Sequence, residues 1–196
     1  MTTALSLDTA LLRGPTHLAR TFMRLFVRPG DHVVDATCGA GRDTLLLAQL
    51  VGPRGRVWAF DIQDEALRAT AERLKKSGLS NCAELIAAGH ERMADYVPKS
   101  VRMVVFNLGY CPGGNRTVIT VPETTMPAVE QALRLLMPEG VLALTVYPGH
   151  SGGLEESAAI FDWLSSLDQR LFHAWRMEQV NTDTNAPYFF LIQKAA

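Results

Sequence analysis

The sequence predicts an α/β fold with a doubly wound, mostly parallel seven-stranded sheet and an antiparallel edge strand. Three observations predict it. Short apolar, β-branched runs alternate with segments of helical periodicity along the chain. A glycine-rich turn at 39–41 joins the first of these runs to a helix, as in nucleotide-binding α/β folds. The last two runs, about 171–180 and 188–193, are separated by a short polar loop and are expected to pair antiparallel.

The first elements follow from local signals. Thr16 is a residue type that caps helices, and the apolar residues after it recur at helical spacing. Residues 29–31, Pro-Gly-Asp, predict a turn before a buried strand that contains the valines 33–34. Asp35 ends this strand, and after the glycine turn residues 42–51 are expected to form a helix.

The same reasoning extends to the rest of the chain. Each further strand is rich in Val, Ile, Leu or Phe, and polar or turn-forming residues follow it. Residues 138–140, Pro-Glu-Gly, predict a turn directly before the fifth strand. The remaining strands are expected at about 56–60, 83–87, 101–106 and 141–147, and the helices at about 64–77, 91–96, 123–137 and 155–167.

Composition limits the class of protein. The 196 residues fit a single domain over 1–196 with an N-terminal helical segment at 1–28, and an apolar content of 47% supports a buried core. A formal net charge of −1 argues against a broad phosphate-binding surface, so any contact with nucleic acid must be local. Cys38, Cys82 and Cys111 lack metal-ligand spacing and suit a reducing compartment. We expect no metal, no membrane span and no signal peptide, and therefore a cytoplasmic location.

Residues suited to chemistry gather where the predicted strands end. The glycine turn, Asp61, Gly89-His90, residues 107–114 and residues 148–153 each follow a strand directly. Because ligands of such sheets bind beyond the carboxyl ends of the strands, these five segments predict one active site.

The glycine turn suits two classes of ligand. Dinucleotide sites need a third glycine, and Thr44 stands in its place. Asp35 followed by Gly39-Ala40-Gly41 instead resembles motif I of class I S-adenosylmethionine (SAM) methyltransferases. Asp61 could accept hydrogen bonds from both ribose hydroxyls, although NAD sites also place an acid there. A purely structural strand–helix connection stays open as a third interpretation.

Four motifs together carry a more specific resemblance. They are residues 35–44, 60–63, 107–114 and 147–156, read as DATCGAGRDT, FDIQ, NLGYCPGG and YPGHSGGLEE. This combination resembles the rRNA methylase family of class I SAM methyltransferases over about residues 16–194. Studied members of that family resemble a tRNA wobble-uridine methyltransferase, which methylates the amine of 5-aminomethyl-2-thiouridine. The resemblance therefore implies SAM as cofactor and the tRNA anticodon loop as partner.

The resemblance also implies a set of site residues. The chain departs from the family at Ala40, where asparagine is usual. The residues expected to bind SAM are Asp35, Gly39, Ala40, Gly41, Asp43, Thr44, Asp61, Gln63, Gly89 and His90. Those expected to bind the substrate are Gly113, Gly114, Arg116 and Tyr147, and those expected to act in catalysis are Asn107, Tyr110 and His150.

The chemistry assigns each catalytic candidate a role. An alkylamine is protonated near neutral pH, with a pKa of about 10.4, and must lose its proton before its lone pair can attack a methyl group. Asn107 could hold the neutral amine, Tyr110 could stack on the uracil ring, and His150 could accept the proton. Asp35 could orient the turn and the methionine amino group, or could be purely structural.

Several alternatives stay open. Cys111 could attack a pyrimidine ring as a nucleophile, which would make the protein a carbon-5 methyltransferase. The acceptor could be another RNA, such as rRNA, or a small amine, and the domain could bind SAM without catalysis. Arg42 and Arg116 are the basic residues best placed for RNA. Arg20, Arg24 and Arg28 are expected on a solvated helix face, with a contact to the RNA backbone as the alternative. A homodimer is also left open.

Overall fold

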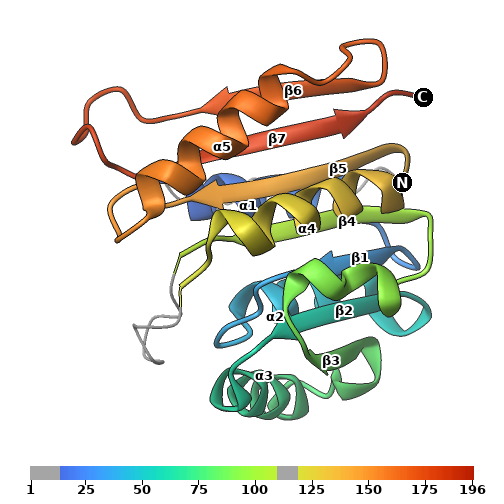
Figure 1. Cartoon of the computed structure of the whole chain (residues 1–196). Coiled ribbons are helices and arrows are strands. Elements are labelled where there is room, and N and C mark those ends of the chain that lie inside the picture. Colours follow the sequence, from blue (N-terminus) through green and yellow to red (C-terminus); the bar gives the residue numbers. More distant parts are fainter. Residues whose placement is uncertain (1–13, 110–118) are drawn as a thin grey trace.

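The computed structural model describes residues 14–109 and 119–196. Seven strands form one sheet in the order β3-β2-β1-β4-β5-β7-β6 (Figure 1). The first five strands in this order are parallel, and β7 runs antiparallel to both β5 and β6. The predicted sheet and its antiparallel edge are therefore confirmed. The strands are β1 (His32–Asp35), β2 (Arg56–Asp61), β3 (Ala83–Ala87), β4 (Val101–Asn107), β5 (Leu136–Val146), β6 (Phe172–Met177) and β7 (Tyr188–Lys194).

Helices cover both faces of this sheet. The helices α1 (Pro15–Phe26), α2 (Arg42–Val51) and α3 (Asp64–Lys76) pack on one face, and α4 (Pro122–Leu135) and α5 (Gly153–Ser165) pack on the other (Figure 1). Three short 3₁₀ helices, Gly52–Arg54, Ser80–Cys82 and His90–Asp95, complete the connections, the last of them beside α4. Within the described ranges, no helix has both the length and the apolar character needed to cross a membrane.

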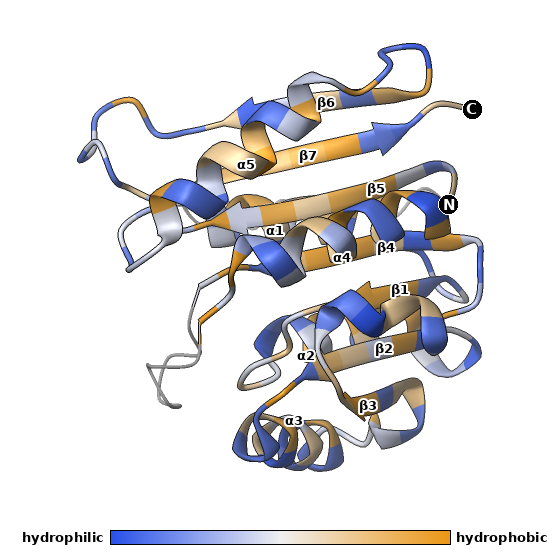
Figure 2. Cartoon of the chain, viewed as in Figure 1, coloured by the Kyte–Doolittle hydropathy of each residue, from blue (hydrophilic) through white to orange (hydrophobic). Residues whose placement is uncertain are grey.

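The central strands are apolar on both sides because each side meets a helical layer. On β1, Val34 packs toward α4 and α5 whereas Val33 packs toward α1 and α2. On β4, Val104 and Phe106 join the first of these cores and Met103 joins the second. Figure 2 shows the resulting apolar colouring of the inner strands. This two-sided burial is why the inner strands read as continuous apolar runs rather than as alternating ones.

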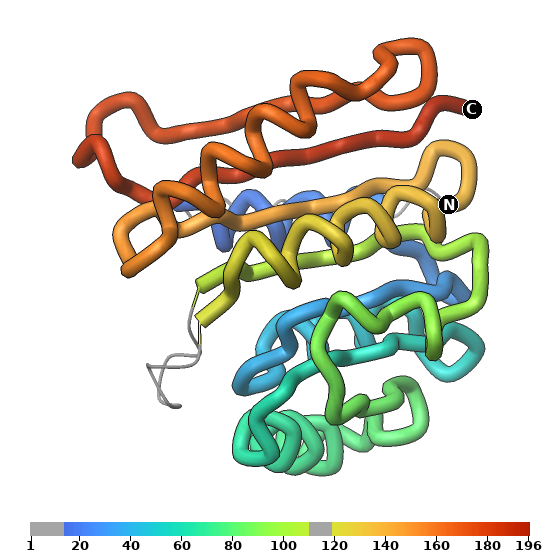
Figure 3. Tube along the Cα trace, in the orientation of Figure 1, coloured from blue at the N-terminus to red at the C-terminus, as the bar shows by residue number. Residues whose placement is uncertain are grey.

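The path of the chain creates a crevice between β1 and β4. The chain runs outward from β1 to β2 and β3 and then returns across the sheet to β4 and β5 (Figure 3). The connections therefore leave β1 and β4 in opposite directions. This is the switch point at which parallel α/β sheets bind ligands.

Two predicted boundaries were wrong. The first helix begins at Pro15 and has Gly14 as its N-cap, with no capping side chain, so Thr16 does not cap it. Proline suits the first helical position because its fixed φ is helical and its missing N–H would have no partner there. The fifth strand begins at Leu136 rather than 141, since Leu136 already pairs with Val101 on β4.

The early start of β5 comes with an irregularity in its pairing. The next pair after Leu136 and Val101 is Val141 and Met103, so β5 has extra residues between the two pairs. Glu139 lies among them with a φ of 62°. The predicted turn thus exists, but it is accommodated as a bulge within the strand rather than before it.

Candidate functional site

A pocket of about 720 Å³ opens at the carboxyl ends of β1 to β5. This volume lies within the usual range for cofactor and substrate clefts, about 300–1,000 Å³. Its wall includes residues that follow each of these five strands, so the five segments meet at one pocket. The predicted site residues that line it are Gly39, Ala40, Asp43, Asp61, Gln63, Gly89, His90, Asn107, Tyr147 and His150.

Other predicted site residues are not part of this wall. Asp35 and Thr44 are 1% and 0% exposed, and they lie beneath the pocket with Gly41 rather than in its lining. Asp35 and Thr44 support the loop through their mutual hydrogen bond, and the expected cofactor contacts of these three residues stay predictions. Four others lie outside the described residues: Tyr110, Gly113, Gly114 and Arg116.

The glycine turn is held in place by its main chain. The Gly39 N–H donates to Asp61 Oδ2 at 2.9 Å, and the Gly39 carbonyl accepts from Thr70 Oγ1 at 2.9 Å. The next carbonyl, that of Ala40, accepts from Arg73 Nε at 2.8 Å. Strand β2 and helix α3 thus anchor the turn without help from the side chain at position 40, where this chain departs from the family pattern.

Gly41 is required by the packing of the turn against α3. Its φ is 74°, and a Cβ there would lie 2.6 Å from Thr70 Oγ1 and 2.8 Å from the Thr70 Cα. We expect Gly41→Ala to lower the free energy of unfolding by about 3 kcal/mol, from left-handed strain and overpacking together. Gly52→Ala is the matched control, because its φ is 62° but nothing lies within 4 Å of the added Cβ. Urea unfolding of both variants is the measurement, and equal losses would show that the Thr70 contact is unimportant.

Asp61 is the acid at the end of β2. Its Oδ1 accepts from the Gln63 N–H at 2.9 Å and its Oδ2 from the Gly39 N–H. Each carboxylate oxygen has a second lone pair, and the side chain lines the pocket. Asp61 can therefore accept further hydrogen bonds from ligand hydroxyls.

His90 offers an unpaired nitrogen to the same pocket. It is buried beside Phe106, with ring centroids 5.6 Å apart, and its Nε2 has no partner among the described residues. Burial lowers the pKa of His90, which keeps the imidazole neutral at neutral pH. Since a buried polar atom without a partner is costly, this nitrogen suits a ligand that carries a polar aromatic edge.

Asp35 lies behind the turn as a buried acid. Its Oδ2 accepts from Thr44 Oγ1 at 2.6 Å, and its Oδ1 accepts from the Thr37 N–H at 3.3 Å. Burial first, and the nearby Asp43 carboxylate second, raise the pKa of Asp35 from 3.8 to about 7. Asp35 therefore titrates near neutral pH, which an ordinary surface aspartate does not do.

This raised pKa predicts a pH effect on stability. Between about pH 4 and pH 7 the folded protein keeps the Asp35 proton whereas the unfolded chain loses it, so stability falls as the pH rises. The full contribution is about 4 kcal/mol. In Asp35→Asn this decline should be absent. The unfolding free energy of the variant should therefore rise relative to that of the wild type between pH 5 and pH 8. The exposed Asp64→Asn is the control, and parallel curves for Asp35→Asn and wild type would contradict the prediction.

Asn107, at the end of β4, has its amide group oriented by an acid. Its Nδ2 donates to Asp43 Oδ2 at 2.7 Å, and Asp43 Oδ1 accepts from Arg20 Nε at 2.7 Å. A carboxylate only accepts hydrogen bonds, so the NH₂ group of Asn107 must face Asp43. The Asn107 Oδ1 then points away from Asp43 and is available as an acceptor. That oxygen is buried and has no partner in the described part of the chain. The pocket wall therefore contains an oriented hydrogen-bond acceptor.

Sequence reasoning missed the part played by Arg20. It was expected on a solvated face, but it lines the pocket together with Thr16, one helical turn away, and it pairs with Asp43. The spacing could not have identified it, because Arg24 and Arg28 continue the same four-residue spacing.

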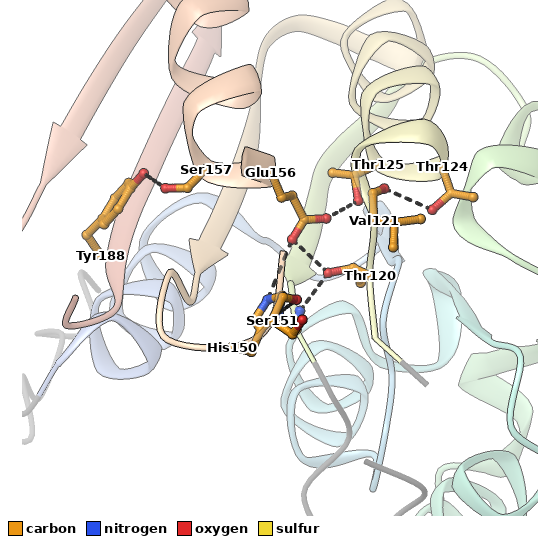
Figure 4. Close-up of polar contacts among 10 residues, drawn as sticks. Thr120, Val121, Thr124, Thr125, His150, Ser151, Glu156, Ser157 and Tyr188 are labelled. Carbon is orange, nitrogen blue, oxygen red and sulfur yellow. Dashed lines mark hydrogen bonds and ion pairs between the residues drawn. The ribbon is translucent and has the colours of Figure 1, made fainter. Parts of the chain in front are cut away.

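His150 lies in the segment after β5, against a second acid that the analysis of the sequence did not assign. Its Nδ1 lies 2.8 Å from the Ser151 carbonyl oxygen, and its Nε2 lies 3.9 Å from Glu156 Oε2 (Figure 4). Glu156 is fully buried and accepts from Thr120 Oγ1 at 2.9 Å and from Thr125 Oγ1 at 2.6 Å. A signal for Glu156 existed, since it falls on the buried face of α5 at helical spacing from Ile160.

Comparison with known proteins gives consistent matches. The family model described as "Putative rRNA methylase" matches residues 57–193. The curated "tRNA (mnm(5)s(2)U34)-methyltransferase, chloroplastic" of Arabidopsis thaliana is 42% identical over an alignment of 162 residues that covers 78% of this chain. The match spans 59% of that relative's length, so the relative extends well beyond it.

Solved structures agree with the sequence matches. A "putative rRNA-methylase" from Clostridium thermocellum is 38% identical with a TM-score of 0.91, covering 94% of this chain and 99% of that one. A "putative methyltransferase" from Streptococcus mutans, solved in complex with S-adenosylhomocysteine (SAH), is 33% identical with a TM-score of 0.84, covering 94% and 99%. Both similarities therefore extend over nearly the whole fold.

Proposed function

The chain belongs to the family described as "Putative rRNA methylase", among the SAM-dependent methyltransferases, and on this premise we propose that it methylates an amine of RNA. The proposed acceptor is the aminomethyl group of 5-aminomethyl-2-thiouridine at the tRNA wobble position. The name of the Arabidopsis relative supports this choice, and the unpaired Oδ1 of Asn107 is the observation that carries it.

The pocket residues fit SAM as the cofactor. Asp61 has free lone pairs for ribose hydroxyls, and the unpaired Nε2 of His90 suits the edge of an adenine. The Gly39 main chain, with a φ of 50°, leaves room for a ligand beside the turn. Asp43 and Asp61 place negative charge around a cofactor whose sulfonium is positive.

The proposed reaction needs positioning more than covalent help. SAM would supply an electrophilic methyl group: the amine lone pair would attack its carbon in line as the carbon–sulfur bond breaks, SAH would leave, and the methylated amine would lose a proton. Asn107 Oδ1 would accept a hydrogen bond from an amine N–H and so direct the nitrogen lone pair. Arg20 and Asp43 keep this amide from rotating, because Asp43 holds the NH₂ group. His150 lines the same pocket, and its role as proton acceptor stays a prediction.

Incubation with SAM and defined acceptors tests the proposal. The acceptors are tRNA that carries 5-aminomethyl-2-thiouridine, the same tRNA without the aminomethyl group, ribosomal RNA and a small alkylamine. Mass spectrometry of the nucleosides should show the 5-methylaminomethyl product only in the first reaction. Methylation of ribosomal RNA or of the small amine alone, or SAM binding without turnover, would overturn the wobble-uridine assignment.

A further inference from the structure

Glu156 is an acid in an unusual place. It is 0% exposed, although moving a carboxylate out of water costs several kcal/mol. In the part of the chain that the structure describes, no Lys or Arg lies within ion-pair distance of it, and the group that can carry an opposite charge is His150. A buried acid beside a ligand pocket, paired with a histidine of the pocket wall, is a candidate for a functional role.

Glu156 connects three segments around the part of the pocket that contains Asn107 and His150, which we call the acceptor side. Its Oε1 accepts from Thr125 on α4, and its Oε2 accepts from Thr120 and faces His150 (Figure 4). Thr120 in turn pairs with Gly109, whose N–H donates to Thr120 Oγ1 at 2.8 Å and whose carbonyl accepts from the Thr120 N–H at 2.9 Å. The carboxylate thus holds together the chain that leaves β4 and the chain that leaves β5.

The imidazole of His150 lies between two oxygen atoms. Its Nδ1 is 2.8 Å from the Ser151 carbonyl oxygen, and its Nε2 faces Glu156 Oε2 at 3.9 Å. This Nε2 is buried and has no hydrogen-bond partner in the described residues. Glu156 is therefore the side chain that borders the ring at this nitrogen.

We propose that Glu156 is a positioning residue: by holding Thr120 and bordering the His150 imidazole it shapes the acceptor side of the pocket beside Asn107. This inference rests on the proposed function, since it assigns the acceptor to that side. Gly109 lies two residues after Asn107, so a shift of the Gly109–Thr120 pair would displace the acceptor amide. The residues proposed to bind SAM follow β1, β2 and β3, whereas Glu156 contacts Thr120, Thr125 and His150, which lie in the segments after β4 and β5.

Glu156→Gln keeps the shape of the side chain and removes its charge. We expect kcat for the RNA acceptor to fall about 10- to 100-fold, because a buried polar network loses its charged member. The dissociation constant for SAM should stay within about two-fold, since the cofactor side is separate. Ser157→Ala is the matched control: it lies next to Glu156 on α5 and breaks a buried hydrogen bond with Tyr188 instead. Equal kcat values for Glu156→Gln and wild type would overturn the proposal.

A spectroscopic measurement tests the pair without any substrate. The chain has five histidines, so the ring-nitrogen signals of His150 can be assigned by comparison with a His150→Gln sample. At one fixed pH these signals should shift in Glu156→Gln and keep their wild-type positions in Ser157→Ala. Unchanged signals in Glu156→Gln would refute the contact between Glu156 and His150, whereas inactivity of the wild type on every acceptor would refute only the proposed function.

Variants of Thr120 decide the matter if Glu156→Gln does not fold. Thr120→Ser keeps the hydroxyl that donates to Glu156 and accepts from Gly109, and Thr120→Val removes it at nearly constant volume. We expect Thr120→Ser to keep wild-type turnover and Thr120→Val to lower kcat about 10- to 100-fold, the loss expected for Glu156→Gln. Equal turnover in the two Thr120 variants would overturn the proposal.

Discussion

Replacement of Asn107 by alanine should lower kcat for the RNA acceptor about 10²- to 10³-fold and leave SAM affinity within a few-fold of wild type. The loss corresponds to one oriented hydrogen-bond partner at the reacting centre. The Oδ1 of Asn107 is an unpaired acceptor in the pocket wall, and its NH₂ group is already held by Asp43. Single-turnover rates with saturating SAM, together with calorimetric SAM binding, provide the measurement.

Thr145→Val is the control for this experiment. Thr145 lies opposite Asn107 on the neighbouring strand β5, it is fully buried, and its hydroxyl also has no partner in the described residues. Thr145 does not line the pocket, so removal of its hydroxyl should leave kcat unchanged. A wild-type rate for Asn107→Ala would exclude Asn107 from the mechanism, and a large loss of SAM affinity would move it to the cofactor side.

The second large effect is expected at Asp61. Asp61→Ala should weaken SAM binding about 100-fold, because hydrogen bonds to a charged acceptor contribute about 1.5–3 kcal/mol each. The variant also removes the acceptor for the Gly39 and Gln63 N–H groups, which orient the turn. Calorimetric titration with SAM and with SAH measures the effect.

Two further variants separate the charge of Asp61 from its shape. Asp61→Asn keeps the size and one acceptor oxygen, so we expect an intermediate loss of affinity, about 10-fold. Asp64→Asn removes an exposed acid three positions further along the chain and should bind SAM normally. If Asp61→Ala binds SAM as tightly as Asp64→Asn does, the ribose role of Asp61 is wrong.

The sheet could be predicted because its signals are local. Strands β1 to β5 are apolar runs that end in turn-forming residues, and helix α2 was predicted with its observed bounds, Arg42–Val51. The boundaries that failed depend on distant partners. The early start of β5 needs Val101 opposite Leu136, and no pattern near Leu136 reports that pairing.

The candidate site was predictable to the extent that strand ends meet. Asp61, His90, Asn107 and His150 follow different strands, yet all four line one pocket. The sequence did not show which residues of each motif line the pocket and which ones are needed for packing. Gly41 looked like a ligand contact, whereas its freedom is needed by the approach of Thr70 from α3.

Taken by itself, the sequence determined the alternation of strands and helices, the glycine turn after β1 and the strand ends that carry polar residues. These features depend on backbone preferences and on apolar spacing within a few residues. Only the tertiary structure decided which side chains pair, because the partners are far apart in the chain. Arg20 and Asn107 reach Asp43 across 23 and 64 positions, and Thr120 reaches Glu156 across 36. Burial then makes these contacts important for function, because a single acceptor oxygen or carboxylate interacts more strongly where water is excluded.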